Sequence, residues 1–206
     1  MQIHDWPMPA TAAIAGIYFV KQMLYPARAT RTHDLLRKDW MQAVAMQRGT
    51  EVLAVQTIRN SLMSCTMTAT TATLAFMAGV TMLHNATPGG LRQIDFLDTF
   101  EHPMYWSALC VLVMLAMSFI TSMLAARYWH HAGFVAGMPV ESEERKHWQP
   151  HGIVCLTRAG RYYALSLRLM MWAAPVLLSG VVPWAGLISA FVLLAVLGTR
   201  VDRQVQ

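Results

Sequence analysis

The chain has 206 residues, of which 55% are apolar and 13% are charged, and its formal net charge is +5. A soluble globular protein has about 25% charged residues, so this composition excludes an ordinary soluble domain and indicates an integral membrane protein. Because four apolar segments leave no room for a separate soluble domain, we expect a single membrane domain over residues 1–206.

The apolar segments predict an all-α, integral membrane helical bundle with four transmembrane helices. The spans lie at about residues 8–26, 62–83, 105–126 and 169–199. The second holds 22 residues without a charge, which is long enough to cross a bilayer core of roughly 30 Å at about 1.5 Å per residue. The first is interpreted as an uncleaved anchor rather than a signal peptide, because no Lys or Arg precedes its apolar run.

The loop over residues 27–61 contains an amphipathic pattern between residues 34 and 47. Its apolar residues recur at helical spacing with charged residues opposite them, and include Leu36, Trp40 and Val44. This pattern is typical of a cytoplasmic helix that lies at the membrane surface.

Two residues after this pattern predict the next helix boundary. Gly49 is expected to end the surface helix, and Thr50 is expected to cap the helix that follows. That following helix is predicted to run unbroken from Glu51 to Leu83, so that it projects from the membrane into the cytoplasm.

The segment over residues 127–168 is predicted to be the second cytoplasmic loop. The third span is expected to continue as a helix to about Phe134 and to stop near Gly137. Residues 140–149 hold three Glu and an adjacent Arg-Lys pair, and we interpret them as a solvated loop.

The last apolar segment, residues 169–199, leaves two alternatives open. A single long, kinked span places the C-terminus outside, whereas a hairpin that turns at Val182-Pro183-Trp184 returns Arg200 and Arg203 to the inside. Each arm of a hairpin has too few apolar residues to span unless protein shields it. We therefore prefer the single long span.

Small residues inside the last two spans predict close helix packing. They are Ser118, Ser122 and Ala126 in the third span and Gly186 and Ala190 in the fourth. None of the 11 Asp and Glu residues falls inside a span, which disfavours transport coupled to protons or sodium.

Lys and Arg are distributed unevenly about the spans. Thirteen of the 16 lie between residues 21 and 61 or between residues 127 and 168. Because Lys and Arg mark cytoplasmic loops, we place the N-terminus outside and the loops 27–61 and 127–168 in the cytoplasm. The positive charge is thus a topology signal, and nucleic acid is not an expected partner.

Three motifs resemble the domain of unknown function 599 family. They are VQTIRNSLMS at residues 55–64, RYWHH at residues 127–131 and GRYYALSLR at residues 160–168. The resemblance covers about residues 30–200 and implies a small multi-span membrane protein of bacteria and plants. It implies no reaction, ligand or catalytic residue.

Polar residues form a stripe at the cytoplasmic end of the second span. The stripe holds Gln56, Asn60 and Ser64 and continues through Thr68 or Thr71. Such a stripe hydrogen-bonds a neighbouring helix, the interpretation we prefer, or lines a water-filled path. The remaining threonines of this span are expected to bond their own backbone, and they are Thr66, Thr70 and Thr73.

Three arginines, Arg59, Arg127 and Arg168, lie at the predicted cytoplasmic ends of the second, third and fourth spans. They anchor helix ends, the interpretation we prefer, or form a basic vestibule that attracts anions and lipid headgroups. The candidate residues of a cytoplasmic mouth are therefore Gln56, Arg59, Asn60, Ser64, Arg127, His131 and Arg168.

Signals for catalysis and cofactors are absent from the sequence. We find no nucleophile–base arrangement, phosphate-binding glycine loop or paired carboxylates, so we expect neither an enzyme nor a bound cofactor. His84, His102 and Met104 are weak candidates for copper(I) at the outer face, because His and Met suit that ion but show no tight ligand spacing here.

The leading functional hypothesis is a homo-oligomeric channel or pore-like protein with a basic cytoplasmic mouth, in a bacterial cytoplasmic (inner) membrane. The first alternative is an accessory or assembly subunit of a larger membrane complex, and a further alternative is copper handling at the outer face. The expected partners are the lipid bilayer and either further copies of the chain or other membrane subunits.

Overall fold

The computed structural model of the chain describes residues 7–24, 28–86 and 103–198. These residues form six helices, which confirms the all-α prediction. The helices are α1 (Pro7–Leu24), α2 (Arg28–Met46), α3 (Glu51–Ala86), α5 (Pro103–Ala136), α6 (Glu143–Val181) and α7 (Pro183–Val196). Three of them, α3, α5 and α6, are long and apolar enough to cross a membrane.

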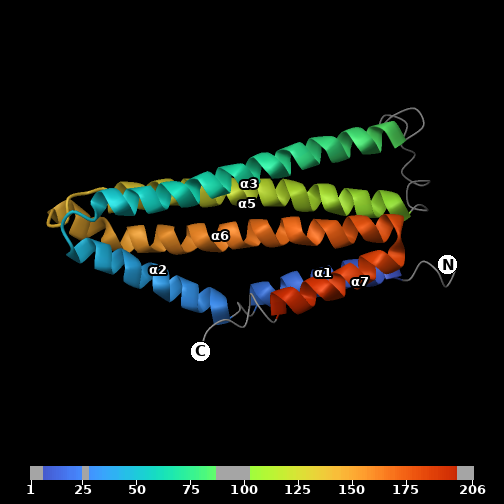
Figure 1. Cartoon of the computed structure of the whole chain (residues 1–206), viewed down its shortest axis with the longest axis horizontal. Coiled ribbons are helices and arrows are strands. Elements are labelled where there is room, and N and C mark those ends of the chain that lie inside the picture. Colours follow the sequence, from blue (N-terminus) through green and yellow to red (C-terminus); the bar gives the residue numbers. More distant parts are fainter. Residues whose placement is uncertain (1–6, 25–27, 87–102, 199–206) are drawn as a thin grey trace.

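The three long helices lie side by side along the long axis of the molecule, with α5 between α3 and α6 (Figure 1). Consecutive long helices run in opposite directions. The three shorter helices cover α6 on the side away from α3, with α2 along one half of its length and α1 and α7 along the other (Figure 1).

The buried side chains divide into two clusters along the axis. One cluster, which we call the inner cluster, lies at the end of the bundle where α2 packs. It joins α2, α3, α5 and α6 around residues such as Met41, Ile58 and Leu156. The outer cluster joins α1, α5, α6 and α7 around Trp172, which is fully buried and lies 5.4 Å from the ring of Tyr18. Each short helix is therefore held by one of the two clusters.

Small residues allow α5 and α6 to pack closely, as the sequence predicts. Ser118 and Ser122 on α5 and Ser166 on α6 are fully buried. The hydroxyl oxygen of Ser166 lies 2.8 Å from that of Ser118 and 2.6 Å from that of Ser122. Ser118 also donates to the carbonyl of Ser166, and Ser166 donates to the carbonyl of Ser118, both at 3.0 Å.

The preferred interpretation of residues 169–199 as one long span is wrong. α6 ends at Val181, the extended residue Val182 follows, and α7 then begins at Pro183. α7 folds back along α6 (Figure 1). Pro183 has no N–H to continue α6 but suits the first turn of a new helix. The short arm is tolerated because α7 packs on both α6 and α1.

The boundaries of α2 and α3 agree only partly with the predictions. The amphipathic helix and the long helix that starts at Glu51 are confirmed as helices α2 and α3, and Gly49 between them has a φ of 82°. α2 packs along α6, and its predicted position at the membrane surface stays a prediction. Thr50 directly precedes α3, and its carbonyl accepts the backbone N–H of Ala54 at 2.9 Å. Its hydroxyl donates to the carbonyl of Gln47 at 2.7 Å.

The two predictions about residues 127–168 have different outcomes. The continuation of the third span is confirmed, since α5 reaches Ala136. The solvated loop is wrong beyond Ser142, because α6 begins at Glu143. Ser142 caps this helix by accepting the backbone N–H of Arg145 at 3.1 Å, and Glu143 and Glu144 in the first turn favour a helix N-terminus.

Gly186 is expected to be essential to the α6–α7 turn. A methyl group at Gly186 would overlap the backbone of Ser179, whereas one at Gly16 on α1 meets nothing within 4 Å. Gly186→Ala should cost about 1–3 kcal/mol, which lowers the melting temperature of the purified protein by roughly 2–4 °C per kcal/mol. Gly16→Ala should leave it unchanged or raise it. Equal melting temperatures for the two variants would contradict the close approach.

Candidate functional site

The predicted stripe on α3 lies on the outside of the molecule. Gln56, Arg59, Asn60 and Ser64 are all exposed. The opposite face of α3 is buried, through Ala54, Ile58, Cys65, Ala69 and Ala72. The stripe therefore faces away from α5, and none of these four side chains points into the interior of the single chain.

Arg127 and His131 are also exposed, on α5. They lie near the level of the α3 stripe, because Gly133 of α5 approaches Ile58 of α3. Arg168 is different: it is only 8% exposed. Since Ser166 pairs with Ser118, Arg168 lies about 20 Å along the bundle from Arg59, at about 1.5 Å per residue. The structure does not bring Arg59, Arg127 and Arg168 to one mouth.

The hydroxyl groups of α3 donate to the backbone of the same helix. Thr66 donates to Met63, Thr70 to Thr66 and Thr73 to Ala69, at 2.9–3.0 Å. Ser64, Thr68 and Thr71 do the same toward residues four positions earlier. The prediction of backbone bonding is confirmed, and it extends to the stripe residues. These groups retain acceptor lone pairs but offer no free donor.

Thr66, Thr70 and Thr73 also line one wall of a groove between α3 and α5. The opposite wall is formed by Phe119 and Met123 of α5, and the groove has a volume of about 350 Å³. The outer surface of α3 therefore presents hydroxyl groups beside exposed apolar side chains such as Met67 and Leu74, and it is recessed in the middle of the helix.

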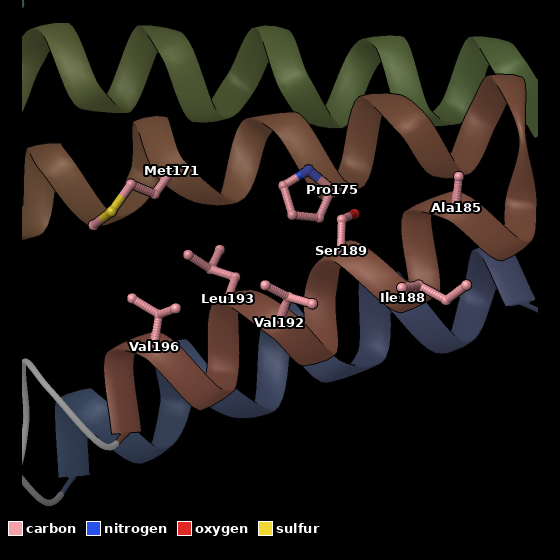
Figure 2. Close-up of a pocket in the computed structure, with 8 residues that line it drawn as sticks. All are labelled: Met171, Pro175, Ala185, Ile188, Ser189, Val192, Leu193 and Val196. Atoms are coloured by element: carbon pink, nitrogen blue, oxygen red, sulfur yellow. The ribbon is translucent and has the colours of Figure 1, made fainter.

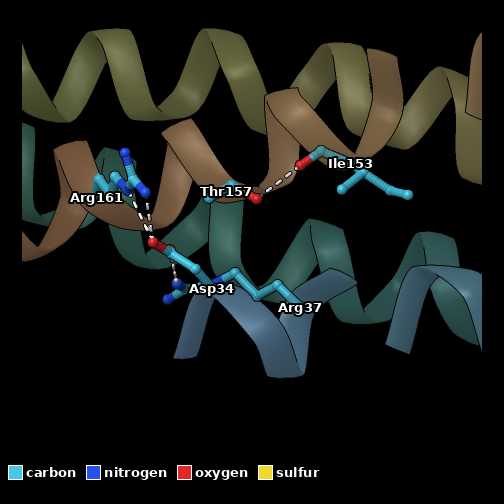
Figure 3. Close-up of polar contacts among 5 residues, drawn as sticks. All are labelled: Asp34, Arg37, Ile153, Thr157 and Arg161. Atoms are coloured by element: carbon cyan, nitrogen blue, oxygen red, sulfur yellow. Dashed lines mark hydrogen bonds and ion pairs between the residues drawn. The ribbon is translucent and has the colours of Figure 1, made fainter. Parts of the chain in front are cut away.

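Asp34 joins α2 to α6. Its carboxylate accepts from Nε and Nη2 of Arg161, each at 2.8 Å, and from Nη1 of Arg37 at 3.4 Å (Figure 3). The pKa of Arg37 is lowered, mainly because burial disfavours its charged form. The carboxylate of Asp34 opposes this shift, and the nearby Arg161 adds to it. Arg37 stays charged at neutral pH. Local sequence patterns do not reveal this cluster, because its residues are far apart in the chain.

Arg145 and Arg48 fix the other end of α2. The buried guanidinium of Arg145 donates to the carbonyls of Met138 and Val44. The exposed Arg48 pairs with Glu141 through both of its carboxylate oxygens. These contacts hold the turn between α2 and α3 against the turn between α5 and α6.

An apolar groove of about 580 Å³ lies between α6 and α7. Met171 and Pro175 of α6 form one wall, and Ile188, Val192 and Val196 of α7 lie across from them (Figure 2). Ser189 is the polar residue of this surface, and its hydroxyl donates to the carbonyl of Gly186 at 2.9 Å. The groove offers apolar contact and no charge.

Two of the three residues considered for copper are described by the structure. His84 and Met104 are exposed on different helices, and His102 lies outside the described residues. Within residues 7–24, 28–86 and 103–198, no group of three or more His, Cys, Asp or Glu is placed to hold a metal ion.

One cysteine–histidine contact was not predicted. The sulfur of Cys155 lies 3.3 Å from Nε2 of His151, one turn earlier on α6. Cys155 is buried in the inner cluster, packed with Leu156 and Ala159. A thiol in that position has no room for a substrate, so this pair is a packing contact.

Comparison with known protein families identifies the chain. The sequence model of the DUF599 family, a family of proteins of unknown function, matches residues 10–205, so the chain belongs to this family. This confirms the resemblance in the three motifs. Neither a curated protein nor a solved structure matches the chain.

The Asp34 cluster should be needed to hold α2 against α6. Asp34→Asn removes the charge that bridges Arg37 and Arg161, and we expect a local loss of about 1 kcal/mol. Hydrogen exchange in residues 28–40 should then become about fivefold faster. Asp39→Asn, an exposed carboxylate on the same helix, is the matched control and should leave exchange unchanged. Unchanged exchange in both variants would show that apolar packing alone holds α2.

Proposed function

We propose that this member of the DUF599 family is a homo-oligomeric, pore-like protein of a bacterial cytoplasmic membrane, in which α3 helices from several copies line a shared axis. The proposal includes no enzymatic activity and no cofactor. The observation that carries it is the outer face of α3, which is exposed and hydroxyl-rich in the single chain.

Aromatic residues support a position for the membrane. On α5, Trp106 and Tyr128 are separated by about 33 Å at 1.5 Å per residue, close to the roughly 30 Å of a bilayer core. Tyr128 stacks on Tyr162 of α6 with 5.6 Å between ring centroids. Tyr and Trp concentrate at membrane–water interfaces, so we place the bilayer between these two levels.

This position gives each half of the molecule a different environment. The outer cluster with α1 and α7 lies inside the bilayer, so α1 supplies a fourth crossing and the α6–α7 turn lies at the outer surface. α2 and the inner halves of the long helices project into the cytoplasm. The arginine-rich segments are then cytoplasmic, as the charge distribution predicts.

The exposure of α3 is the reason to expect more than one copy. In the 18-residue apolar stretch of α3, only 11% is buried inside the chain, compared with 39% in the corresponding stretches of α5 and of α6. The exposed side of α3 mixes Ser and Thr with large apolar side chains such as Met67 and Leu74, and its small residues allow close helix approach. Burying this face against other α3 helices matches its composition.

The polar end of α3 gives the assembly a basic entrance. Ile58 lies level with Gly133, beyond Tyr128 on the cytoplasmic side, so Arg59 and Asn60 lie just outside the bilayer. A ring of Arg59 side chains, one from each copy, would attract anions to the axis. The acceptor lone pairs of the α3 hydroxyls would line the path beyond it.

A second candidate function is an accessory subunit of a larger membrane complex. The hydroxyl hydrogens of α3 are used within the helix, so the face offers close packing without requiring water. A helix from a different protein satisfies that face as well as a second α3 does. Cross-linking in native membranes distinguishes the two cases.

Substitution of Thr70 tests the α3 interface. Thr70→Trp places a bulky ring on the exposed face and should reduce the oligomer to monomers, measured by mass photometry in lipid nanodiscs. Ile17→Trp, on the exposed face of α1, is the control and should leave the oligomer intact. Thr70→Cys, combined with Cys110→Ser, should form a disulfide between two copies on oxidation. A monomeric parent protein would overturn the proposal, and a cross-link to a different chain would favour the accessory subunit.

Substitution of Arg59 tests the basic entrance. In liposomes, Arg59→Glu should lower the permeability ratio of chloride to potassium severalfold, because it reverses the charge at the axis. Arg31→Glu makes the same charge change on the exposed face of α2 and should have little effect. A parent protein that conducts no ions would eliminate the pore and leave only an assembly role.

A further inference from the structure

A line of exposed residues runs along the side of α3 that faces away from α5. Ile58, Cys65 and Ala72 are buried on the opposite side of the helix, where α3 packs on α5. The members of the line recur at alternating intervals of four and three residues, the spacing that keeps side chains on one side of a helix. We call this line the exposed seam, and it consists of Gln56, Asn60, Met63, Met67, Thr70, Leu74, Met77, Thr81 and His84, all of which are exposed.

The exposed seam carries large side chains where its flanks carry small ones. Between residues 63 and 77, four of the five seam residues are Met or Leu, and their side chains are 53% to 69% exposed. The exposed residues that flank the seam over the same stretch are Ser64, Thr66, Thr71, Thr73 and Ala78. The methionine and leucine side chains therefore extend beyond the hydroxyl groups on either side of them.

In the assembly proposed above, the exposed seam faces the shared axis. Copies of one chain in one bilayer have the same orientation, so each seam residue meets its equivalents at the same depth. Each position of the seam then becomes a ring of identical side chains around the axis. This arrangement of rings rests on the proposed function.

The rings change from polar to apolar along the axis. Gln56 and Asn60, beside Arg59, give a polar entrance on the cytoplasmic side. The next two rings, Met63 and Met67, follow each other with no polar seam residue between them. Because Ile58 lies level with Gly133 and the two helices run in opposite directions, Met63 lies level with Tyr128. The first methionine ring is thus placed at the cytoplasmic surface of the bilayer.

The apolar stretch of the axis is long. From Met63 to Met77 it extends for about 21 Å at 1.5 Å per residue, and Thr70 is its one polar ring. The hydroxyl of Thr70 donates to the carbonyl of Thr66 at 3.0 Å, so it offers only lone pairs to water. A narrow apolar constriction excludes water, and with it ions.

Methionine suits a constriction that can also open. Its side chain is unbranched and has three rotatable bonds, so it adopts several shapes at small cost. The small residues beside the seam, such as Ser64 and Thr66, leave room for a methionine side chain to turn away from the axis. Rotation of side chains would then expose the flanking hydroxyl groups without any movement of the helices.

We propose that the rings of Met63 and Met67, continued by those of Leu74 and Met77, form an apolar gate that keeps the pore closed most of the time. When the methionine side chains turn aside, water enters the axis, and anions that gather at Arg59 pass. The parent protein is therefore a slow conductor whose rate is set by the gate.

The test measures the initial rate of chloride efflux from liposomes that contain equal amounts of the full-length protein or of a variant. The parent protein should give a slow but measurable rate. Met67→Ser and Leu74→Ser should each raise the rate severalfold, and the double variant should raise it about tenfold or more, because each hydroxyl ring shortens the apolar stretch. Met67→Leu keeps the ring apolar and should not raise the rate.

Met117→Ser on α5 is the matched control. Since Gly79 of α3 meets Leu112 of α5, Met117 lies at about the depth of Leu74. Met117 is also exposed, but it is not part of the exposed seam. The same polar substitution at this position should leave the rate of efflux unchanged. Mass photometry in lipid nanodiscs checks that each variant keeps the oligomer of the parent, and Leu74→Ser replaces Met67→Ser if the latter does not assemble.

The outcomes separate the gate from the pore. If the parent protein conducts and the assembled seam variants conduct no faster, the gate is wrong and the pore stands. An increase with Met117→Ser or Met67→Leu as large as that with Met67→Ser would also overturn the gate. Absence of chloride efflux from the parent protein and from every variant would contradict the pore itself.

Discussion

The close packing of α5 against α6 is the interaction on which the rest of the structure depends. Both helices are much longer than a bilayer is thick, and they stay in contact along their length. Inside the membrane, apolar burial does not drive helices together, so packing and hydrogen bonds must do so. Ser118, Ser122 and Ser166 supply both, because their size allows close approach and their hydroxyls bond across the interface.

This pair gives α6 a free side that the short helices use. α2 packs along one half of α6 through charged contacts, such as Asp34 with Arg161, and α1 and α7 pack along the other half through apolar contacts around Trp172. Charges are stable near water and costly in lipid. The proposed position of the bilayer therefore matches the change from ionic to apolar contacts along α6.

The sequence predicted features that depend on local pattern and missed those that depend on distant contacts. Helical spacing revealed α2, and the Gly49–Thr50 boundary placed the start of α3, because helix periodicity and termination are local properties. The α6–α7 hairpin was not preferred, since the shielding of α7 by α1 lies outside any local window. Arg168 was expected at a mouth beside Arg59, and only the register of Ser118 with Ser166 shows how far apart they lie.

The exposed face of α3 and the short helices lie on opposite sides of the α5–α6 pair. α3 packs on α5, whereas α2 and α7 pack on α6 away from α3 (Figure 1). Copies that meet through α3, as proposed, therefore leave the side of α6 that carries α2 and α7 outside the shared contact. α2 connects the two sides of the pair, because Asp34 near its start is paired with Arg161 of α6 and its end leads through Gly49 into α3.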